Sequence, residues 1–249
     1  MALSSEELNR VLIGRMARWH FVPTILAANN LLREAVDRSA IYVTGNTVVD
    51  AIGVIRNRWV DGASSARFPS FFPGRDLVLV TAHRRENHGV VLSRICRALR
   101  ILCENHPELG FVFPVHLNPH VRTVVLKELS NIPNLGLTDP VDFETSLYLQ
   151  SQSRLIITDS GGIQEEAPSF GVPTVVMRDH TERSEGIAAG FSTLAGTNAE
   201  SIVDAAEAYL NSTTIRAELA ARPNPYGDGK ASERIIDILL GGSPEPFHG

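Results

Sequence analysis

Short runs of β-branched and aromatic residues alternate along the chain with longer stretches of helical periodicity. The apolar runs are continuous rather than alternating, which is typical of parallel strands buried on both faces. They lie at residues 41–44, 77–82, 111–115, 155–159 and 174–177, with amphipathic helical stretches such as 89–105 and 197–210 between them. This alternation predicts an α/β fold with a doubly wound parallel sheet.

Three segments lie outside this pattern. Residues 1–40 are mostly helical in pattern, with one short extended piece at 20–24, and residues 231–240 predict a last helix. The Ser-, Pro- and Gly-rich residues 62–74 predict a loop, which could be an extended connection, a surface lid or a disordered tip. We therefore expect a leading segment (1–40), one main domain (41–230), and a C-terminal helix with a flexible tail (231–249).

Composition narrows the class of protein. A hydrophobic share of 43% and a charged share of 20% are those of an ordinary soluble globular protein. No apolar run reaches about 18 residues and the start lacks a secretory pattern, so we expect no membrane partner and a cytoplasmic location. The net charge of −5 argues against nucleic acid as a partner. Cys96 and Cys103 lie two helical turns apart, too far for a disulfide, and predict free core thiols.

Candidate chemistry gathers after the predicted strands, where open parallel sheets bind their ligands. Polar, charged or glycine residues follow all five strands, at 44–46, 82–87, 116–119, 159–162 and 178–183. This edge of the sheet is therefore the candidate site. Metal-binding spacings such as HxxxH, CxxC or HExxH do not occur in the sequence, so no metal is predicted.

The fourth strand end carries an anion-binding pattern. Ser160, Gly161 and Gly162 open a predicted helix whose first N–H groups could hold a phosphate, although a purely structural turn would have the same sequence. One turn later, Glu166 could accept hydrogen bonds from ribose hydroxyls, or serve only as a partner of the helix dipole. The charged residues 181–185 form either a surface salt-bridge lattice or a helix start that faces the same crevice.

The second and third strand ends carry histidines. A lone histidine at a strand end is usually structural, but His83 is followed by Arg84 and Arg85. Three adjacent basic side chains at a ligand edge favour a role in holding a diphosphate or a leaving group. His116 and Asn118 are weaker candidates, because the pair could simply cap a helix.

Seven ordered motifs resemble one known family. They are SEELNR (5–10), IYVTGNTVVDAI (41–52), VTAHRREN (80–87), PVHLNPHVR (114–122), TDSGGIQEEAPSFGVP (158–173), MRDHTERSEGIAAG (177–190) and NPYGDGKASERI (224–235). Over essentially its whole length the chain resembles the non-hydrolysing UDP-N-acetylglucosamine 2-epimerases. The resemblance implies a GT-B-like architecture of two Rossmann-like domains, of which this chain matches the second domain and the last stretch of the first. Residues 1–40 would then be a remnant of the first domain.

The resemblance also implies a reaction and a set of site residues. The family interconverts UDP-GlcNAc and UDP-ManNAc by eliminating UDP to a 2-acetamidoglucal and adding it back, without a cofactor, and its full-length members are expected to be homodimers. UDP would be held by His83 and Arg183 at the diphosphate, by Ser160, Gly161 and Gly162 at a phosphate, and by Glu166 at the ribose. Arg84 and His116 match positions that line a regulatory UDP-GlcNAc site in bacterial members.

Departures from the family pattern concern catalysis. Two of the three catalytic carboxylates usually cited belong to motifs that this sequence lacks, whereas Glu6 matches the third, which leaves Glu6 and His83 as the catalytic candidates. Smaller departures are Ser5, Ala82 and Ser184, which replace a proline, a glycine and a proline. We therefore expect this chain alone to lack epimerase activity and to expose apolar faces. The alternatives are a non-catalytic module that binds UDP or a UDP-sugar, and a GT-B-type glycosyltransferase domain, which the motifs disfavour.

Overall fold

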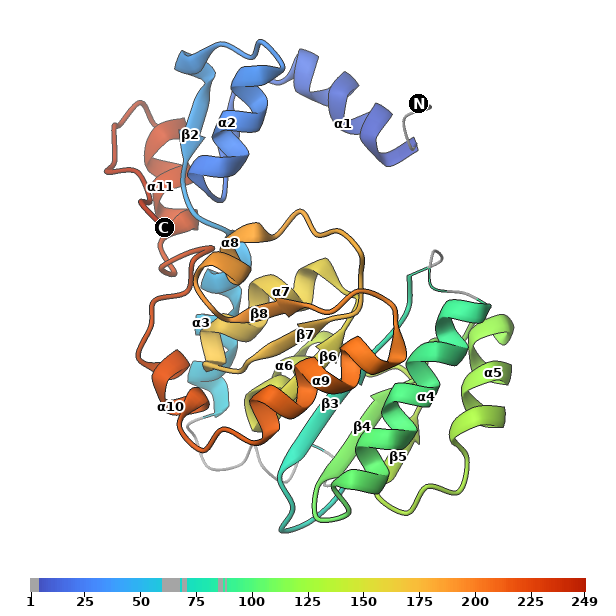
Figure 1. The fold of residues 1–249 in the computed structure, drawn as a ribbon. Helices are drawn as coiled ribbons and strands as arrows, with labels where there is room; N and C mark the ends of the chain where they lie inside the picture. Colours follow the sequence, from blue (N-terminus) through green and yellow to red (C-terminus); the bar gives the residue numbers. More distant parts are fainter. Residues whose placement is uncertain (1–4, 60–67, 69–70, 85–86, 88) are drawn as a thin grey trace. The chain divides into compact units, whose positions relative to one another are not determined.

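The computed structural model describes residues 5–59, 68, 71–84, 87 and 89–249 (Figure 1). The chain forms two compact units, one made of residues 54–223 and the other of residues 1–53 and 224–249. The predicted boundaries differ, because residues 41–53 and 224–230 were expected in the main domain. In the part of the chain that the structure describes, no helix is both long and apolar enough to cross a membrane.

The larger unit is built on a six-stranded parallel sheet. Its strands are β3 (Leu77–Thr81), β4 (Gly110–Pro114), β5 (Leu135–Thr138), β6 (Ser153–Thr158), β7 (Thr174–Val176) and β8 (Ser192–Leu194). Their order across the sheet is β5-β4-β3-β6-β7-β8. The chain therefore starts in the middle, runs outward to β5 and returns to β6 on the other side of β3. Parallel sheets of this kind bind ligands where the order reverses, which here is between β3 and β6.

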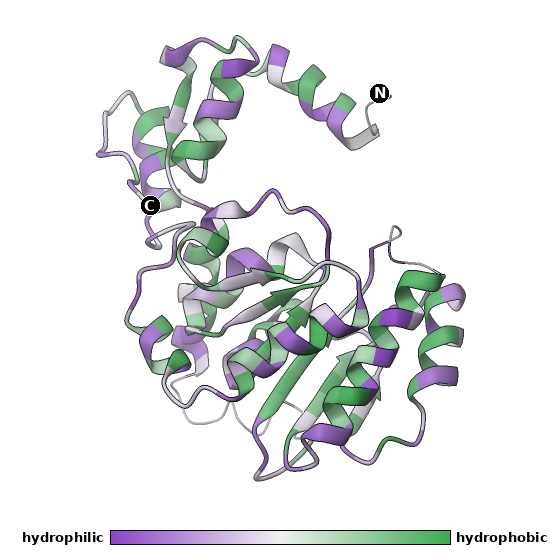
Figure 2. Ribbon diagram, in the orientation of Figure 1, coloured by the Kyte–Doolittle hydropathy of each residue, from purple (hydrophilic) through white to green (hydrophobic). Residues whose placement is uncertain are grey.

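Helices cover both faces of this sheet (Figure 1). One core cluster joins α4 (Val90–Asn105), α5 (Pro119–Leu129) and α9 (Ala199–Leu210) to strand residues such as Val78 and Val80. Leu79, between those two valines, belongs to the opposite cluster with residues of α6 (Phe143–Gln152) and α7 (Gly161–Glu166). The remaining elements are a 3-10 turn η4 (Ala167–Phe170), α8 (Ser184–Ala188) and α10 (Ile215–Ala220). Apolar strands between amphipathic helices, visible in Figure 2, confirm the predicted doubly wound α/β fold.

Helix α4 shows how the apolar pattern determines packing. Its fully buried residues recur at the spacing of one helical face, as in Leu92, Ile95, Cys96, Leu99 and Cys103. Both cysteines are free and buried, as predicted. Burial raises the pKa of each thiol to about 12, so neither is a nucleophile at neutral pH.

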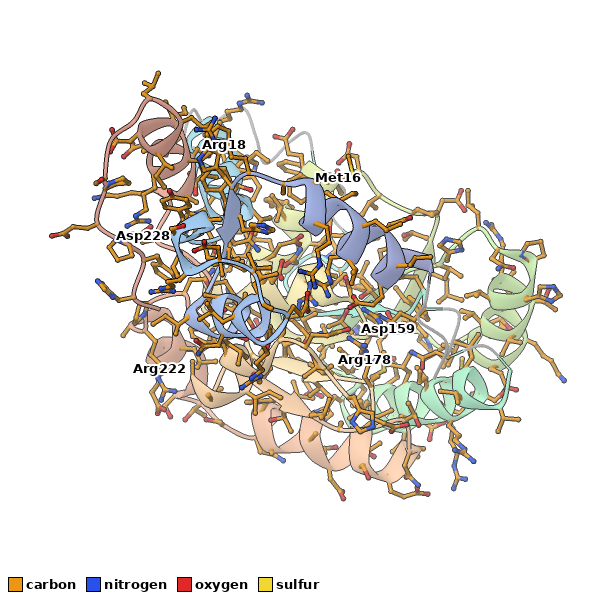
Figure 3. The ribbon with its side chains drawn as sticks, turned by 90° about the horizontal axis from the view of Figure 1, so that it is seen from above. Met16, Arg18, Asp159, Arg178, Arg222 and Asp228 are labelled. Carbon is orange, nitrogen blue, oxygen red and sulfur yellow. The ribbon has the colours of Figure 1, made fainter. Side chains whose placement is uncertain are left out.

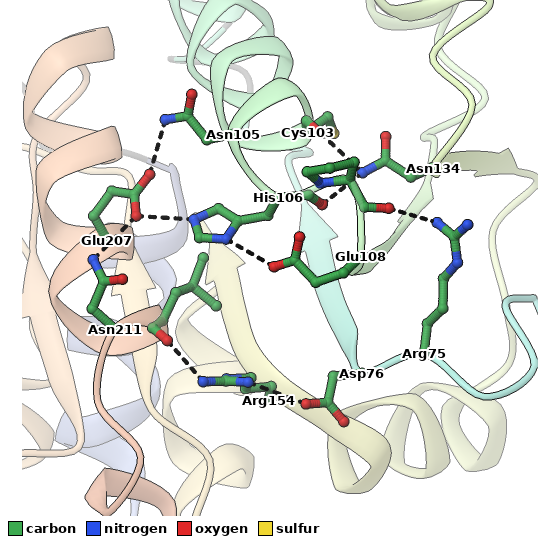
Figure 4. Close-up of polar contacts among 12 residues, drawn as sticks. Arg75, Asp76, Cys103, Asn105, His106, Glu108, Asn134, Arg154, Glu207 and Asn211 are labelled. Carbon is green, nitrogen blue, oxygen red and sulfur yellow. Dashed lines mark hydrogen bonds and ion pairs between the residues drawn. The ribbon is translucent and has the colours of Figure 1, made fainter.

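A network of hydrogen bonds and ion pairs links helices and strands at the amino-terminal edge of the sheet (Figure 4). His106 Nε2 lies 2.9 Å from Glu207 Oε2 of α9, and its Nδ1 lies 3.2 Å from Glu108 Oε1. Nearby, Arg154 donates to the carbonyl of Leu210 at 2.8 Å. These contacts join α4, β6 and α9 at the edge opposite the candidate site.

The smaller unit contains α1 (Ser5–Met16), β1 (His20–Val22), α2 (Ile25–Arg33), a 3-10 turn η1 (Arg38–Ala40), β2 (Ile41–Val43) and α11 (Ala231–Leu239), and the boundary between the units falls within α3 (Thr47–Trp59). Strand β2 pairs in parallel with β1. The prediction that 41–44 is a strand of the main sheet is therefore wrong. Val22, Ala28 and Ile41 form a small core of their own. The apolar run at 41–44 is therefore buried in this core and not in the main sheet.

The chain's last residues also belong to the smaller unit. Phe247 is only 8% exposed, and its backbone N–H donates to the carbonyl of Val43 at 2.9 Å. Arg234 of α11 donates to the carbonyls of Thr44 and Glu245, both at 2.9 Å. One aromatic side chain and an arginine thus give contacts to the tail that was expected to be flexible.

Two further expectations concern exposed and irregular segments. Apolar faces are exposed as predicted, with Leu12, Ile13 and Met16 on α1 and Ile236 and Leu239 on α11. Most of the predicted loop 62–74 lies outside the described residues. Its described part is anchored, since the ring of Phe68 stacks on Tyr148 at 4.1 Å and Phe71 and Phe72 pack against the cluster around Leu79.

Candidate functional site

The last residues of β3 and β6 meet at the point where the strand order reverses. The hydroxyl oxygens of Thr81 and Thr158 are 2.5 Å apart. The backbone N–H of Ser160 donates to the same Thr158 oxygen at 2.9 Å, which bends the chain away from β6. The loop after β3 and the loop after β6 therefore begin side by side.

Asp159 ties these two loops together. Its carboxylate is fully buried and accepts the backbone N–H groups of His83 and Arg84, at 3.1 and 2.9 Å, and the side-chain amide of Asn87 at 2.8 Å. A buried carboxylate is stable only when donors of this kind surround it. Asp159 and Arg178 are both labelled in Figure 3. They follow β6 and β7, which pair with each other in the sheet. Sequence reasoning noted Asp159 only within a polar strand end, and did not select it.

The two candidate histidines line one cavity of about 210 Å³. His83 is half-exposed (48%), and its Nδ1 lies 3.3 Å from Asp159 Oδ1. His116 Nδ1 accepts the N–H of Asn118 at 3.1 Å, so a neutral His116 carries its proton on Nε2. The other lining residues are mostly apolar: Leu79, Thr81, Ala82, Pro114, Pro140, Val141, Ser146 and Leu149. Whole-ligand pockets usually measure about 300–1,000 Å³, so this one suits a single ring.

Arg183 lies against the first turn of α7. A Cβ atom built on Gly161 would stand 3.3 Å from the guanidinium carbon of Arg183, so the glycine permits this close approach. Ser160 caps the helix, with its hydroxyl accepting the N–H of Ile163 at 3.5 Å. A guanidinium beside the first-turn N–H groups of a helix is a favourable place for a phosphate or another anion.

Both alternatives for the charged run 181–185 describe part of the structure. Arg183 Nε donates to Glu165 Oε1 at 2.9 Å, and its Nη1 lies 3.5 Å from Glu182 Oε2, which is an ion-pair lattice. The same run also leads into α8 beside the candidate site. Arg178 hydrogen-bonds Glu182 and lowers the pKa of that carboxyl to about 2, so Glu182 keeps its negative charge.

Glu166 is held from a helix that sequence reasoning did not connect with the site. Gln150 of α6 donates to Glu166 Oε2 at 2.6 Å, and burial raises the pKa of the Glu166 carboxyl. Its second oxygen faces Gly162, where an added Cβ would lie 3.4 Å away. Gln164, fully buried, bridges the Ser160 carbonyl and the Thr181 hydroxyl. Gln150 and Gln164 could have been identified in the sequence as glutamines on helix faces that are expected to be buried.

Most predicted site residues therefore come together. Ser160 follows Asp159, which holds His83 and the backbone of Arg84. Arg183 lies close to Gly161, and Glu166 lies close to Gly162. Arg85 lies outside the described residues, and so does the side chain of Glu6, which belongs to the smaller unit. Among the described residues, no three His, Cys, Asp or Glu side chains are grouped as metal ligands.

Comparisons with known proteins identify the family of the chain. The family model described as UDP-N-acetylglucosamine 2-epimerase matches residues 3–240. A curated Yersinia pestis protein of that name is 45% identical over 94% of this chain and 64% of its own length. The Neisseria meningitidis epimerase, solved bound to UDP-GlcNAc, superposes with a TM-score of 0.90 at 39% identity, covering 96% of this chain and 65% of that one.

A more distant structure supports the same assignment. The Methanocaldococcus jannaschii UDP-GlcNAc 2-epimerase, in complex with UDP-GlcNAc and UDP, has a TM-score of 0.82 at 34% identity and covers 95% of this chain and 65% of that one. This chain thus spans somewhat less than two thirds of the curated relatives it matches, 64% in the Yersinia protein. With the motifs, the reversed strand order and the family model in agreement, the chain belongs to the UDP-N-acetylglucosamine 2-epimerase family.

Proposed function

We propose that the larger unit binds the UDP part of a UDP-sugar, and that the protein interconverts UDP-GlcNAc and UDP-ManNAc. The observation that carries the proposal is that Arg183 lies against Gly161. Gly161 directly follows Ser160 and is the first residue of α7. The guanidinium and the first-turn N–H groups together form a preorganised site for a diphosphate.

Each predicted residue receives a role in this proposal. His83 and Arg183 hold the diphosphate, Ser160 and the two glycines after it hold a phosphate through the helix start, and Glu166 accepts the ribose hydroxyls. The apolar cavity beside His83 receives the uracil ring, whose flat shape suits a space of about 210 Å³. The ion pair with Glu165 supports the role of Arg183, because it holds the guanidinium in place before the ligand arrives.

The proposed reaction breaks and re-forms the bond between the sugar and UDP. A base removes the C2 proton, the electron pair forms a C1–C2 double bond, and UDP leaves with the electrons of the C1–O bond. UDP then adds back to C1 and a proton is delivered to the other face of C2, which gives the epimer. Neither step transfers a hydride, so the reaction as written requires no redox cofactor. His83 and Arg183 stabilise the charge on departing UDP, and Glu6 is the proposed carboxylate for proton transfer.

We propose a cytoplasmic enzyme of nucleotide-sugar supply for polysaccharide synthesis that works as a homodimer. The exposed Leu12, Ile13 and Met16 of α1 are consistent with association. Arg84 and His116 are proposed to bind regulatory UDP-GlcNAc. For both residues, the support is their place in the motifs at 80–87 and 114–122.

One experiment separates the proposal from the alternatives of a binding module or a transferase. The chain alone, and a fusion that adds the segment of the Yersinia relative which this chain does not match, are incubated with UDP-GlcNAc in deuterated water. NMR then follows C2 of the sugar. We expect the fusion to incorporate deuterium at C2 and to produce UDP-ManNAc. A folded fusion that binds UDP-GlcNAc but leaves C2 unchanged would exclude epimerisation and favour a binding module.

A further inference from the structure

We propose that Asp159 is a positioning residue, which fixes the imidazole of His83 as its Nδ1–H tautomer and so directs Nε2 away from the protein toward the ligand. The tautomer itself follows from the geometry. Its value for binding a diphosphate rests on the proposed function.

The carboxylate of Asp159 is itself held rigidly. It is fully buried at the end of β6, and the backbone N–H groups of His83 and Arg84 donate to it. The side chain of Asn87 donates to Oδ2 as well, at 2.8 Å. Backbone donors cannot rotate away, so the two carboxylate oxygens have little freedom to move.

The ring of His83 meets this fixed acceptor. Nδ1 lies 3.3 Å from Asp159 Oδ1. This is an ion-pair distance, and a carboxylate has only acceptor atoms, so its charge favours the proton on the nearer ring nitrogen. The neutral ring then has its lone pair on Nε2, and the charged ring donates from Nε2 while Asp159 balances its charge. The charged form is the one that hydrogen-bonds a phosphate oxygen, because the lone pair of the neutral form would be repelled by it.

The substitution Asp159→Asn should move the proton of the neutral His83 ring to its other nitrogen. An amide has one acceptor oxygen and one NH₂ group in place of two acceptors. The backbone N–H of Arg84 is a donor that cannot change, so the amide oxygen should occupy the Oδ2 position. The NH₂ group would then face His83 Nδ1, which must become an acceptor. The proton of the neutral ring moves to Nε2. The amide also carries no charge to balance a protonated ring, so the charged form that binds the diphosphate is less favoured.

NMR on protein labelled with ¹⁵N-histidine tests this directly. The chain is compared with Asp159→Asn and with the control Asn87→Ala, which removes a donor to the same carboxylate but leaves Nδ1 of His83 facing it. His83→Gln identifies the His83 signals, and His116 is the internal reference because its Nδ1 accepts a backbone N–H. Calorimetry measures UDP binding for each variant that folds.

We expect the Nδ1–H tautomer for neutral His83 in the unmodified chain and in Asn87→Ala, and the Nε2–H tautomer in Asp159→Asn. UDP should bind on the order of tenfold more weakly to Asp159→Asn than to Asn87→Ala. An Nε2–H tautomer in the unmodified chain would overturn the inference even if the variant failed to fold, and so would an unchanged tautomer in folded Asp159→Asn. If His83→Gln leaves UDP affinity unchanged, the role of His83 in UDP binding fails while the tautomer result still decides the inference.

Discussion

Replacement of Arg183 by alanine should separate ligand binding from folding. The side chain is 31% exposed, and its ion pairs with Glu165 and Glu182 lie at the surface of the site. Partly exposed pairs of this kind contribute about 0–1 kcal/mol to stability. A hydrogen bond from a guanidinium to a phosphate is worth about 1.5–3 kcal/mol, because it is charge-assisted. We therefore expect UDP affinity to fall roughly 10- to 150-fold, with a small change in the free energy of unfolding.

Arg154→Ala is the matched control for this variant. Arg154 is 33% exposed and pairs with Asp76 at 3.2 Å, so it resembles Arg183 in burial and charge. It lies at the beginning of β6, whereas the candidate site lies at the end of that strand. Calorimetry measures UDP binding and urea unfolding measures stability for both variants. The argument would be refuted if Arg183→Ala bound UDP normally but was several kcal/mol less stable, since Arg183 would then be structural.

Three more outcomes follow from the same structure. Leu99→Ala, in the fully buried face of α4, should lower the free energy of unfolding by about 2–5 kcal/mol in urea titrations. The pKa of Glu166 is raised by burial, so its contribution to stability is present at acidic pH and is lost as pH rises through the folded-state value. Glu166→Gln should consequently be more stable than the unmodified chain at neutral pH, lose that advantage in acid, and bind UDP more weakly. The 249-residue chain without its fusion partner should leave the C2 proton of UDP-GlcNAc unexchanged, and exchange at the rate of a complete relative would contradict this.

The main sheet and its helices could be predicted because their patterns are long and strongly apolar. Runs such as 77–82 and 155–159 are buried on both faces, and α4 has a full amphipathic face. Strands β5 and β8 were missed, because their sequences LGLT and STL are short and contain glycine or hydroxyl residues. A short apolar run does not specify its pairing partner, which explains why β2 was assigned to the wrong sheet.

The residues of the candidate site that could be predicted are those whose residue type has one main structural or electrostatic role. Ser160 and the glycines after it mark a helix start, and Arg183 carries a charge beside it. The role of Asp159 was not predictable, because it depends on backbone donors of another loop that are distant in sequence. The same applies to Gln150, which reaches Glu166 only when α6 packs beside α7.

The central claim is that the start of α7, together with Arg183 and His83, binds the diphosphate of UDP. Calorimetric titration of the chain with UDP, UMP and uridine tests it most directly. UDP should bind more tightly than UMP, and uridine most weakly, with the difference between UDP and uridine reduced in Arg183→Ala. Equal affinities for all three ligands would contradict the claim, because phosphate would then contribute nothing to binding.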